Sequence, residues 1–433
     1  MRKLYFVMLA LSISAIWSCS QELDELEEMG FSSTRAKSVI FDSEYITVSY
    51  DSVVDSRVFL RAEFNSAAIG CPLKTKGFMY SLVDPNPRYG GKSVIRRTAS
   101  KNDGDTIFRD VALNKRDTYL YYRGFCLTEE DDTIYSKVDS VMIAATPPEI
   151  KTLAVDNRTR VSAIALGCFT NLGDEELLRY GVCLNKKGFP TLNDTYLTAT
   201  DIATDDTYNG TFGVWFDNLE PTTLYHIRAF CVFKRSKTQE NDTIYGNERV
   251  FRTTKGGDVQ WEWADKANAS RDQINRIQIA MDSACYYYNN YSNLTHRIRV
   301  SYNAGVPTAD CNIVGSMRYG ANERYQWVGT AQHEMSHAMG VGTASNWGTF
   351  GDPWSKPIAA LSLKVMMQDM TIVIHGAYSG QQHFWPGGIN QKEEVTNGTS
   401  NNKGVTFKNE HMLKLNAMMC NAMRADGLSG WWE

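Results

Sequence analysis

The sequence of 433 residues lacks several signals that would assign a function class directly. It has no long basic run and its net charge is −4, so nothing in it indicates a nucleic-acid partner. It holds nine cysteines but no Cys-x-x-Cys pair, which argues against cysteine ligation of a metal. The apolar stretch 4–17 is too short to span a bilayer comfortably as a helix. The remaining composition, 43% hydrophobic and 22% charged residues, is that of a globular protein with about three domains.

The first residues have the pattern of an export signal. Met1-Arg2-Lys3 is positive, residues 4–17 are apolar, and the stretch ends in Ile16-Trp17-Ser18-Cys19. This end resembles a bacterial lipobox, which implies removal of residues 1–18 as a signal peptide and lipidation of Cys19. The alternative is an ordinary secretory signal cleaved near Ser18.

Residues 19–36 form an acidic tether that contains Glu-Leu-Asp-Glu-Leu-Glu-Glu. Such a tract resembles the surface-export signals of some Gram-negative outer-membrane lipoproteins. The resemblance implies an outer-membrane lipoprotein exposed at the cell surface, held to the membrane by its lipid anchor alone. Export also permits disulfides among the eight other cysteines, and Cys168 and Cys231 are candidates for facing strands of one domain, although pairing cannot be deduced from sequence.

Two segments between residues 37 and 256 repeat each other. Motifs recur at offsets of 104 to 110 residues, so one unit of about a hundred residues is used twice. The matched pairs begin at Gly77 and Gly181, Leu113 and Leu219, Arg123 and Arg228, and Asp132 and Asp242. Short alternating runs separated by turn signals such as Asn209-Gly210 predict β-strands in both segments.

The run Leu219-x-Pro-x-Thr-x-Tyr225 resembles the tyrosine corner of fibronectin type III sandwiches. We therefore expect two all-β domains of this kind, 37–147 and 148–256. They are expected to act as spacers that lift a further domain off the membrane; a direct role in holding substrate is the alternative.

The composition changes after the segment 253–257. Six of the seven histidines lie beyond it, and helical periodicity begins. The patterns predict helices near 270–287, 325–339, 356–369 and 409–423, with strands at 297–302 and 313–319. Residues 257–433 are therefore predicted to form an α+β domain of zincin-like type.

The predicted helix at 325–339 carries His333-Glu334-Met335-Ser336-His337. Residues i and i+4 share one face of a helix, so both imidazoles can point at one Zn²⁺ ion. Glu334 adjoins this face without being a ligand and is the candidate general base and acid. Two exposed histidines on a surface helix are the alternative interpretation.

Gly340 stands where a metzincin helix ends in a glycine turn, but the third metzincin histidine is replaced by Thr343. The third ligand must therefore come from elsewhere. His383, in the aromatic and glycine-rich stretch 381–390, is favoured, and leishmanolysin-type enzymes show that an insertion can separate this histidine from the helix. Asp352, in a stretch resembling the aspzincin Gly-Thr-x-x-Asp, and His411 are the alternatives.

Residues 295–430 resemble a group of secreted bacterial metallopeptidase-like domains. The resemblance rests on motifs that begin at Val306, Gly315, His333, Gln382 and Ala422. It implies a site role for His383 but no particular substrate. In zincins a strand antiparallel to the bound peptide lies beside the cleft, and the stretch 315–320 is the candidate for it.

These features together predict a zinc metalloendopeptidase that hydrolyses extracellular proteins or glycoproteins. A glycan- or protein-binding adhesin with an inactive or structural zinc site is the alternative, and a peptidase-like module of a nutrient-uptake system is a third, weaker one. The sequence leaves the cleavage preference and the oligomeric state open.

Overall fold

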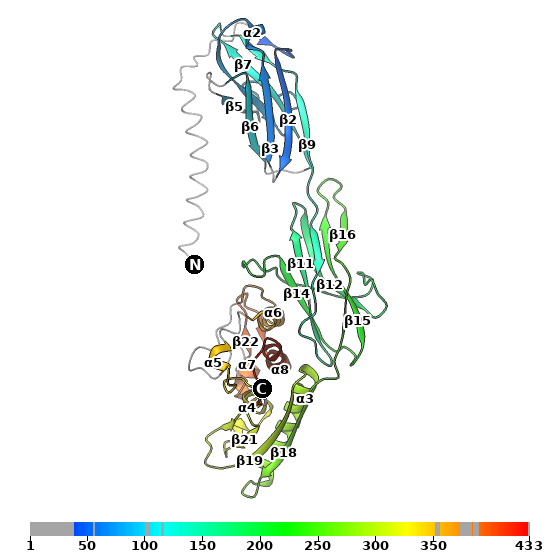
Figure 1. Cartoon of the computed structure of the whole chain (residues 1–433), viewed down its shortest axis with the longest axis vertical. Helices are drawn as coiled ribbons and strands as arrows, with labels where there is room; N and C mark the ends of the chain where they lie inside the picture. Colours follow the sequence, from blue (N-terminus) through cyan, green and yellow to red (C-terminus); the bar gives the residue numbers. More distant parts are fainter. Residues whose placement is uncertain are drawn as a thin grey trace. The chain divides into compact units, whose positions relative to one another are not determined.

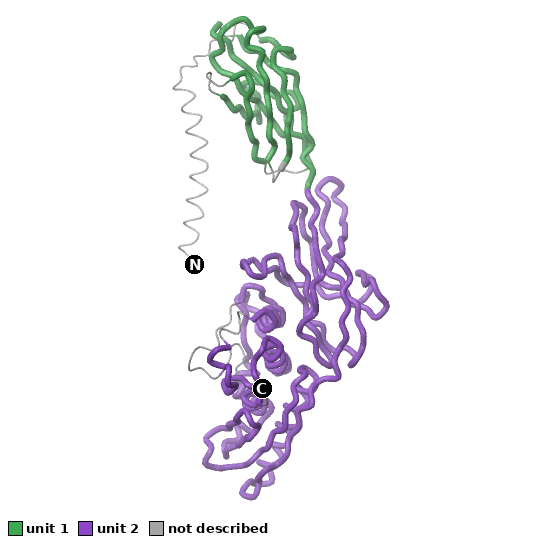
Figure 2. The backbone as a smooth tube through the Cα atoms, viewed as in Figure 1, with its two compact units in different colours: residues 1–145 green, residues 146–433 purple. Residues whose placement is uncertain are grey.

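The computed structural model describes residues 39–54, 57–99, 104–113, 117–130, 132–350, 356–372, 383 and 389–431. The chain divides into two compact units, residues 1–145 and 146–433 (Figure 2). Cys19 and the acidic tether lie outside the described residues. No helix in the described part of the chain has both the length and the apolar character needed to cross a membrane.

The first unit is a β-sandwich (Figure 1). Side chains along each strand point alternately into the core and towards solvent. In β3 (Arg57–Phe64) the buried side chains are those of Val58, Leu60, Ala62 and Phe64. One sheet has the order β2-β3-β6, with β2 at Ile46–Val54 and β6 at Thr106–Ala112. The other has the order β1-β8-β7-β4-β5 with β9 beside β7, and its strands span Val39–Ile40, Thr133–Tyr135, Thr118–Thr128, Leu73–Ser81, Ile95–Ala99 and Asp139–Ile143. A short helix, α2 (Ser66–Ile69), follows β3.

The second sandwich repeats this plan at the start of the second unit. Its smaller sheet has the order β10-β11-β14, with strands at Glu149–Thr152, Ala163–Asn171 and Thr211–Phe216. Its larger sheet has the order β13-β12-β15-β16 with β17 beside β15, and these strands span Thr195–Thr198, Glu176–Asn185, Leu224–Lys234, Asn241–Tyr245 and Arg249–Arg252. Both sandwiches are thus fibronectin type III-like, with a three-stranded sheet facing a larger one.

Equivalent side chains make equivalent contacts in the two sandwiches. The Arg123 guanidinium lies 4.9 Å from the centre of the Tyr135 ring, and that of Arg228 lies 4.6 Å from the centre of the Tyr245 ring. Each of these tyrosine hydroxyls accepts a backbone N–H from the loop across the sheet, from Tyr89 at 3.1 Å and Leu192 at 3.2 Å. The repeat inferred from the sequence is confirmed by these contacts.

Within the described residues, a tyrosine corner is found in the second sandwich. The Tyr225 hydroxyl accepts the backbone N–H of Glu220 at 2.9 Å. In the first sandwich the side chain of Tyr119 is exposed and Leu120 takes the buried position. The motif pair that begins at Leu113 and Leu219 aligns Tyr119 with Tyr225. This alignment is wrong by one residue, because alternation along the strand turns the Tyr119 side chain to the solvent face.

The rest of the second unit is built on a four-stranded sheet of order β18-β19-β21-β20. The strands span Asp258–Asp265, Thr295–Tyr302, Ser316–Tyr319 and Ala309–Cys311; the first three are parallel and β20 is antiparallel at the edge. The predicted order of helix, strands and helix is observed, but β18 and β20 were not predicted. The stretch 315–320, expected to lie beside a bound peptide, is an interior strand because β21 is paired on both sides.

Helix α3 (Arg271–Tyr291) begins at a capping box in which Ser270 and Gln273 bond each other's backbone N–H groups. The later elements are η1 (Glu323–Tyr325), α4 (Val328–Ala338), α5 (Trp347–Phe350), α6 (Pro357–Met366), α7 (Lys392–Asn397), β22 (Thr399–Ser400), β23 (Thr406–Phe407) and α8 (Glu410–Ala425). The core of this part is formed by the buried faces of α3, α4, α6 and α8 together with the sheet.

The second sandwich shares this core. Ile164, Leu166 and Ala203 pack in one cluster with the helices that follow. The close approach of α6 to β14 requires glycine at position 213. A Cβ there would meet the Val365 side chain at 2.4 Å. The segments on either side of residue 256 thus share one hydrophobic core.

The eight cysteines beyond Cys19 are all free thiols. Cys168 lies on β11 and Cys231 on β15, in the two sheets of the second sandwich, but they are not bonded.

Candidate metal centre

Helix α4 lies against α3, α8 and the edge of the sheet, so most of its side chains are buried. It ends at a glycine turn as predicted: Gly340 has φ 108° and Gly342 has φ 73°, which are conformations that side chains disfavour. The buried helix and its rigid end fix the direction of the histidines it carries.

The structure brings His333, His337 and His383 together. The nitrogen atoms they offer lie within 4.8 Å of one another, and the ring centres are 4.8 to 5.4 Å apart. Two nitrogens that share one tetrahedral Zn²⁺ ion are about 3.3 Å apart, given bonds of about 2.0–2.1 Å. The three histidines therefore lie close enough together to be candidate ligands of one ion, once their nitrogens move from separations of up to 4.8 Å to ligand distance.

The backbone after α4 selects the tautomer of His337. The Val341 carbonyl accepts a hydrogen bond from Nδ1 at 2.8 Å, which leaves Nε2 free to bind a metal. Thr343, at the position of the missing third histidine, donates its hydroxyl to the His337 carbonyl. This residue therefore stabilises the helix end and is not aimed at the cluster.

The alternatives for the third ligand have different outcomes. His411 lies on α8, where its Nε2 is 3.0 Å from the Met366 carbonyl and its ring packs on Phe407 and Trp215. It does not join the cluster. Asp352 lies outside the described residues.

Burial lowers the pKa of all three histidines. The pKa of His333 falls to about 3, because the ring is buried and because His337 and His383 lie nearby. The pKa of His337 and that of His383 are also lowered, mainly by burial. Neutral imidazoles are the form that binds a metal, so the site is prepared to accept a cation at neutral pH.

Glu334 is buried on the side of α4 that faces β20. Burial raises the pKa of its carboxyl to about 8; the charge of Asp310 adds to the rise, and a hydrogen bond from the backbone N–H of Cys311 opposes it. The contact with Cys311 was not predicted, because nothing in the sequence indicates that Ala309–Cys311 is a strand. It places the carboxylate at the edge of the sheet.

No protein-family model matches the chain, and no curated protein matches it either. Among solved structures, the chain is similar to the FN1–FN3 domains of chicken CNTN1, with 13% identity, 51% of this chain and 69% of that chain covered, and a TM-score of 0.20. It is also similar to the sensor domain of the anti-sigma factor RsgI4 of Pseudobacteroides cellulosolvens, with 16% identity, 25% and 96% covered, and a TM-score of 0.18. At these TM-scores neither likeness adds to the argument, and the description of the sandwiches rests on their own strand order.

Proposed function

We propose that the protein is a zinc metalloendopeptidase of zincin-like type, with His333, His337 and His383 as metal ligands and Glu334 as general base and acid. The observation that carries the proposal is the convergence of these three histidines beside a buried glutamate. Within the described residues, the group of His, Cys, Asp and Glu side chains brought together consists of these three histidines. Three protein ligands with an open position are typical of catalytic zinc sites, whereas structural sites have four.

The chemistry of the residues supports this role. A bound zinc ion would supply a Lewis acid that polarises the peptide carbonyl and makes water acidic. Glu334 would take the proton of the attacking water and pass it to the leaving amine, for which a carboxyl with a pKa raised towards neutrality is suited. The Val341 carbonyl would hold His337 in the metal-binding tautomer, and the Cys311 N–H would orient the Glu334 carboxylate.

The edge strand β20 is the candidate for peptide binding, in place of the stretch 315–320. It is antiparallel to its neighbour β21 and lies beside α4. A peptide can add to such an edge by main-chain hydrogen bonds. The pattern at Cys19 supports a lipoprotein at the outer-membrane surface, and such a location gives access to extracellular proteins or glycoproteins as substrates.

Zinc content and peptidase activity of the full chain test the proposal. We expect about one zinc per chain in the wild type, its loss in His383→Ala, and its retention in the matched control His411→Ala. Glu334→Gln should keep the zinc and lower turnover by about a hundredfold to ten-thousandfold. A wild-type protein without zinc, or an active Glu334→Gln variant, would contradict the assignment.

The adhesin alternative makes a different prediction for the same variants. If the site only stabilises a binding surface, the wild type will hold zinc but show no hydrolysis, and Glu334→Gln will bind its partner as the wild type does. A group of three histidines beside a buried glutamate favours the enzyme, because catalytic zinc sites have three protein ligands.

A further inference from the structure

Strand β18 has one edge that no other strand of the described chain covers. It stands at the end of the sheet order β18-β19-β21-β20, where its partner is β19. The Asp258 N–H donates to the Leu294 carbonyl at 2.9 Å, on the side of β19. In a parallel pair, successive residues direct their N–H and C=O groups to opposite sides, so those of Val259, Trp261 and Trp263 face away from β19.

Asn289 of α3 already pairs with this edge at one residue. Its side-chain oxygen accepts the Val259 N–H at 2.7 Å, and its amide nitrogen donates to the Val259 carbonyl at 3.0 Å. The amide side chain thus makes the two main-chain hydrogen bonds that a neighbouring strand would make. No described residue bonds the outward main-chain groups of Trp261 and Trp263, so this part of the edge is open to a further strand.

Apolar side chains lie beside the open part of the edge. Trp261 and Trp263 are partly buried, and their ring centres are 5.5 Å apart. The Trp261 indole N–H donates at 2.8 Å to Asp282 of α3, the helix that runs beside the strand (Figure 1). Ile279 and Tyr286 lie one helical turn on either side of Asp282 and are 66% and 57% exposed. These two side chains, the two tryptophans and the outward main-chain groups of the tryptophans form the β18 edge surface.

The opposite face of β18 carries acidic side chains. Asp258 lies 3.9 Å from Arg297 and Glu262 lies 3.4 Å from Arg299, both as exposed ion pairs that are weak in water. The two arginines stand on β19, so the carboxylates are the charges that a strand added to the free edge would meet. If two copies of β18 paired with each other, like charges would lie across the strand pair and destabilise it. The charge therefore disfavours a second copy of this chain and favours a strand with Lys or Arg.

We propose that the β18 edge surface binds an extended peptide segment by strand addition, with apolar side chains towards Trp261 and Trp263 and Lys or Arg side chains on the opposite face. Side chains alternate along an extended strand, so one segment presents both kinds. The site lies at the opposite edge of the sheet from β20, across three strand spacings of about 4.8 Å each. It is therefore separate from the candidate metal centre and depends on neither zinc nor hydrolysis.

Binding of a fluorescent peptide of alternating Lys and Val residues to the full chain tests the inference by fluorescence anisotropy. The Glu334→Gln chain is used so that the peptide is not cleaved, and a chelator should leave its affinity unchanged. We expect saturable binding that is at least about tenfold weaker for a peptide of alternating Glu and Val. A Lys–Val peptide methylated at alternate main-chain nitrogens should also bind at least about tenfold more weakly, because strand addition needs those N–H groups. Absence of binding, or binding that a chelator abolishes, would overturn the proposal.

Ile279→Lys and its matched control Val250→Lys add the same charge at exposed positions, where a substitution disturbs folding little. Val250 is 56% exposed and belongs to β17 of the second sandwich. Ile279→Lys should weaken binding of the Lys–Val peptide about tenfold through lost apolar contact and repulsion, whereas Val250→Lys should change it by less than about twofold. Equal weakening in the two variants would show that the peptide binds elsewhere.

Two further measurements test the choice of occupant. Glu262→Lys should reverse the preference between the Lys–Val and Glu–Val peptides, and an unchanged preference would contradict the role of charge. Analytical ultracentrifugation tests pairing between copies of the chain, and we expect a monomer. A wild type that dimerises, with an Ile279→Lys variant that does not, would assign the edge to a second copy and refute the peptide site.

Discussion

The outer faces of the three-stranded sheets distinguish the two sandwiches. In the first, Phe59 and Arg61 on β3 and Phe108 and Asp110 on β6 point outward; Phe59 is 38% and Phe108 is 57% exposed. In the second, the equivalent positions hold Ile164, Leu166, Gly213 and Trp215, and Ile164 and Leu166 are at most 4% exposed. The first sandwich therefore forms a compact unit of its own, whereas the second sandwich, with the same fold, is part of a larger core.

The difference depends on a few substitutions within a constant frame. Gly213 stands at the position of Phe108 and allows Val365 of α6 to approach. Trp215 stands at the position of Asp110 and packs against His411 of α8, with ring centres 5.4 Å apart. A repeated fold is thus converted into an interface by removing one large side chain and replacing charged groups with apolar ones.

Two separate deletions, one of each sandwich, should differ most in whether the remaining chain folds. A chain without residues 148–256 exposes the apolar faces of α6 and α8. It also loses Asn157, and with it the hydrogen bonds of 2.8 Å that Ser362 and Asn421 make to that side chain. We expect it to aggregate or remain unfolded, whereas a chain without residues 39–145 should fold and bind zinc. Circular dichroism and size-exclusion chromatography measure the outcome. A soluble, folded product of the first deletion would contradict the shared core.

Exchanging one residue at equivalent positions should have the next largest effect. Gly213→Phe forces an aromatic ring into Val365 and should destabilise the second unit by more than about 4 kcal/mol, a value typical of severe overpacking. The reciprocal change Phe108→Gly removes an exposed ring and should destabilise the first unit by about 1 kcal/mol through the strand propensity of glycine. Chemical denaturation of both variants gives the comparison, and similar losses in the two would contradict it.

Metal removal should affect only one of the two units. If zinc binds His333, His337 and His383, a concentration a thousandfold above the dissociation constant stabilises the second unit by about 4 kcal/mol. A chelator should lower the unfolding temperature of the second unit and leave that of the first unchanged. Calorimetry resolves the two transitions, and a shift in both or in neither would show that the metal is not confined to the predicted centre.

The pH dependence of the metal-free second unit should reveal the buried glutamate. The folded pKa of Glu334, about 8, lies above its ordinary value of 4.5, so its contribution to stability is full below pH 4.5 and is lost as pH rises to about 8. Each unit of pKa difference corresponds to at most about 1.4 kcal/mol. Glu334→Gln should therefore gain stability relative to wild type as pH rises across this window. A constant difference between the two proteins from pH 4.5 to 8 would contradict the burial of the carboxyl.

The tyrosine corner should give the smallest difference. Tyr225→Phe removes the hydrogen bond to the Glu220 N–H and should destabilise the second unit by about 1 kcal/mol. Tyr119→Phe changes an exposed hydroxyl and should leave the first unit unchanged within about 0.5 kcal/mol. Equal effects would show that the hydroxyl of Tyr225 has no special structural role.

The features predicted from the sequence are those with strong local signals. The repeat, the sandwiches and the helices have regular apolar spacing, and the spacing of His333 and His337 places both on one helix face. His383 was favoured from its aromatic and glycine-rich surroundings, and the structure places it beside the pair. Its role as a ligand stays a prediction.

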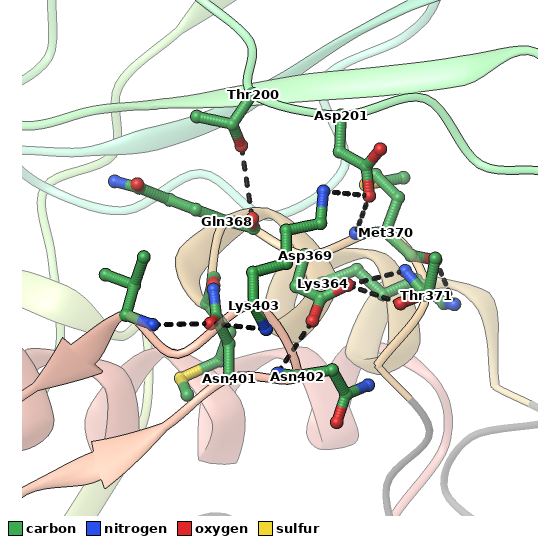
Figure 3. Close-up of polar contacts among 12 residues, drawn as sticks. Thr200, Asp201, Lys364, Gln368, Asp369, Met370, Thr371, Asn401, Asn402 and Lys403 are labelled. Carbon is green, nitrogen blue, oxygen red and sulfur yellow. Dashed lines mark hydrogen bonds and ion pairs between the residues drawn. The ribbon is translucent and has the colours of Figure 1, made fainter. Parts of the chain in front are cut away.

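The features that were not predicted depend on contacts with residues elsewhere in the sequence. Strand β20 is three residues long, Ala309–Cys311, and only its pairing with β21 defines it. Strand β18 follows a stretch with the composition of a linker and is formed by parallel pairing with β19. The bonds of Asp201 to Met370 and Lys403 (Figure 3) have no sequence signal, because these partners lie more than 160 positions away along the chain.

The shared core also determines how the chain bears mechanical force. When the chain is pulled between its N-terminal end and helix α8, the load passes through the first sandwich before it reaches the second unit. The second sandwich is joined to α6 and α8 by packing and by the bonds of Asn157, so many contacts bear the load in parallel. We therefore expect a pull at the N-terminal end to unfold the first sandwich before it disturbs the core that holds the three histidines.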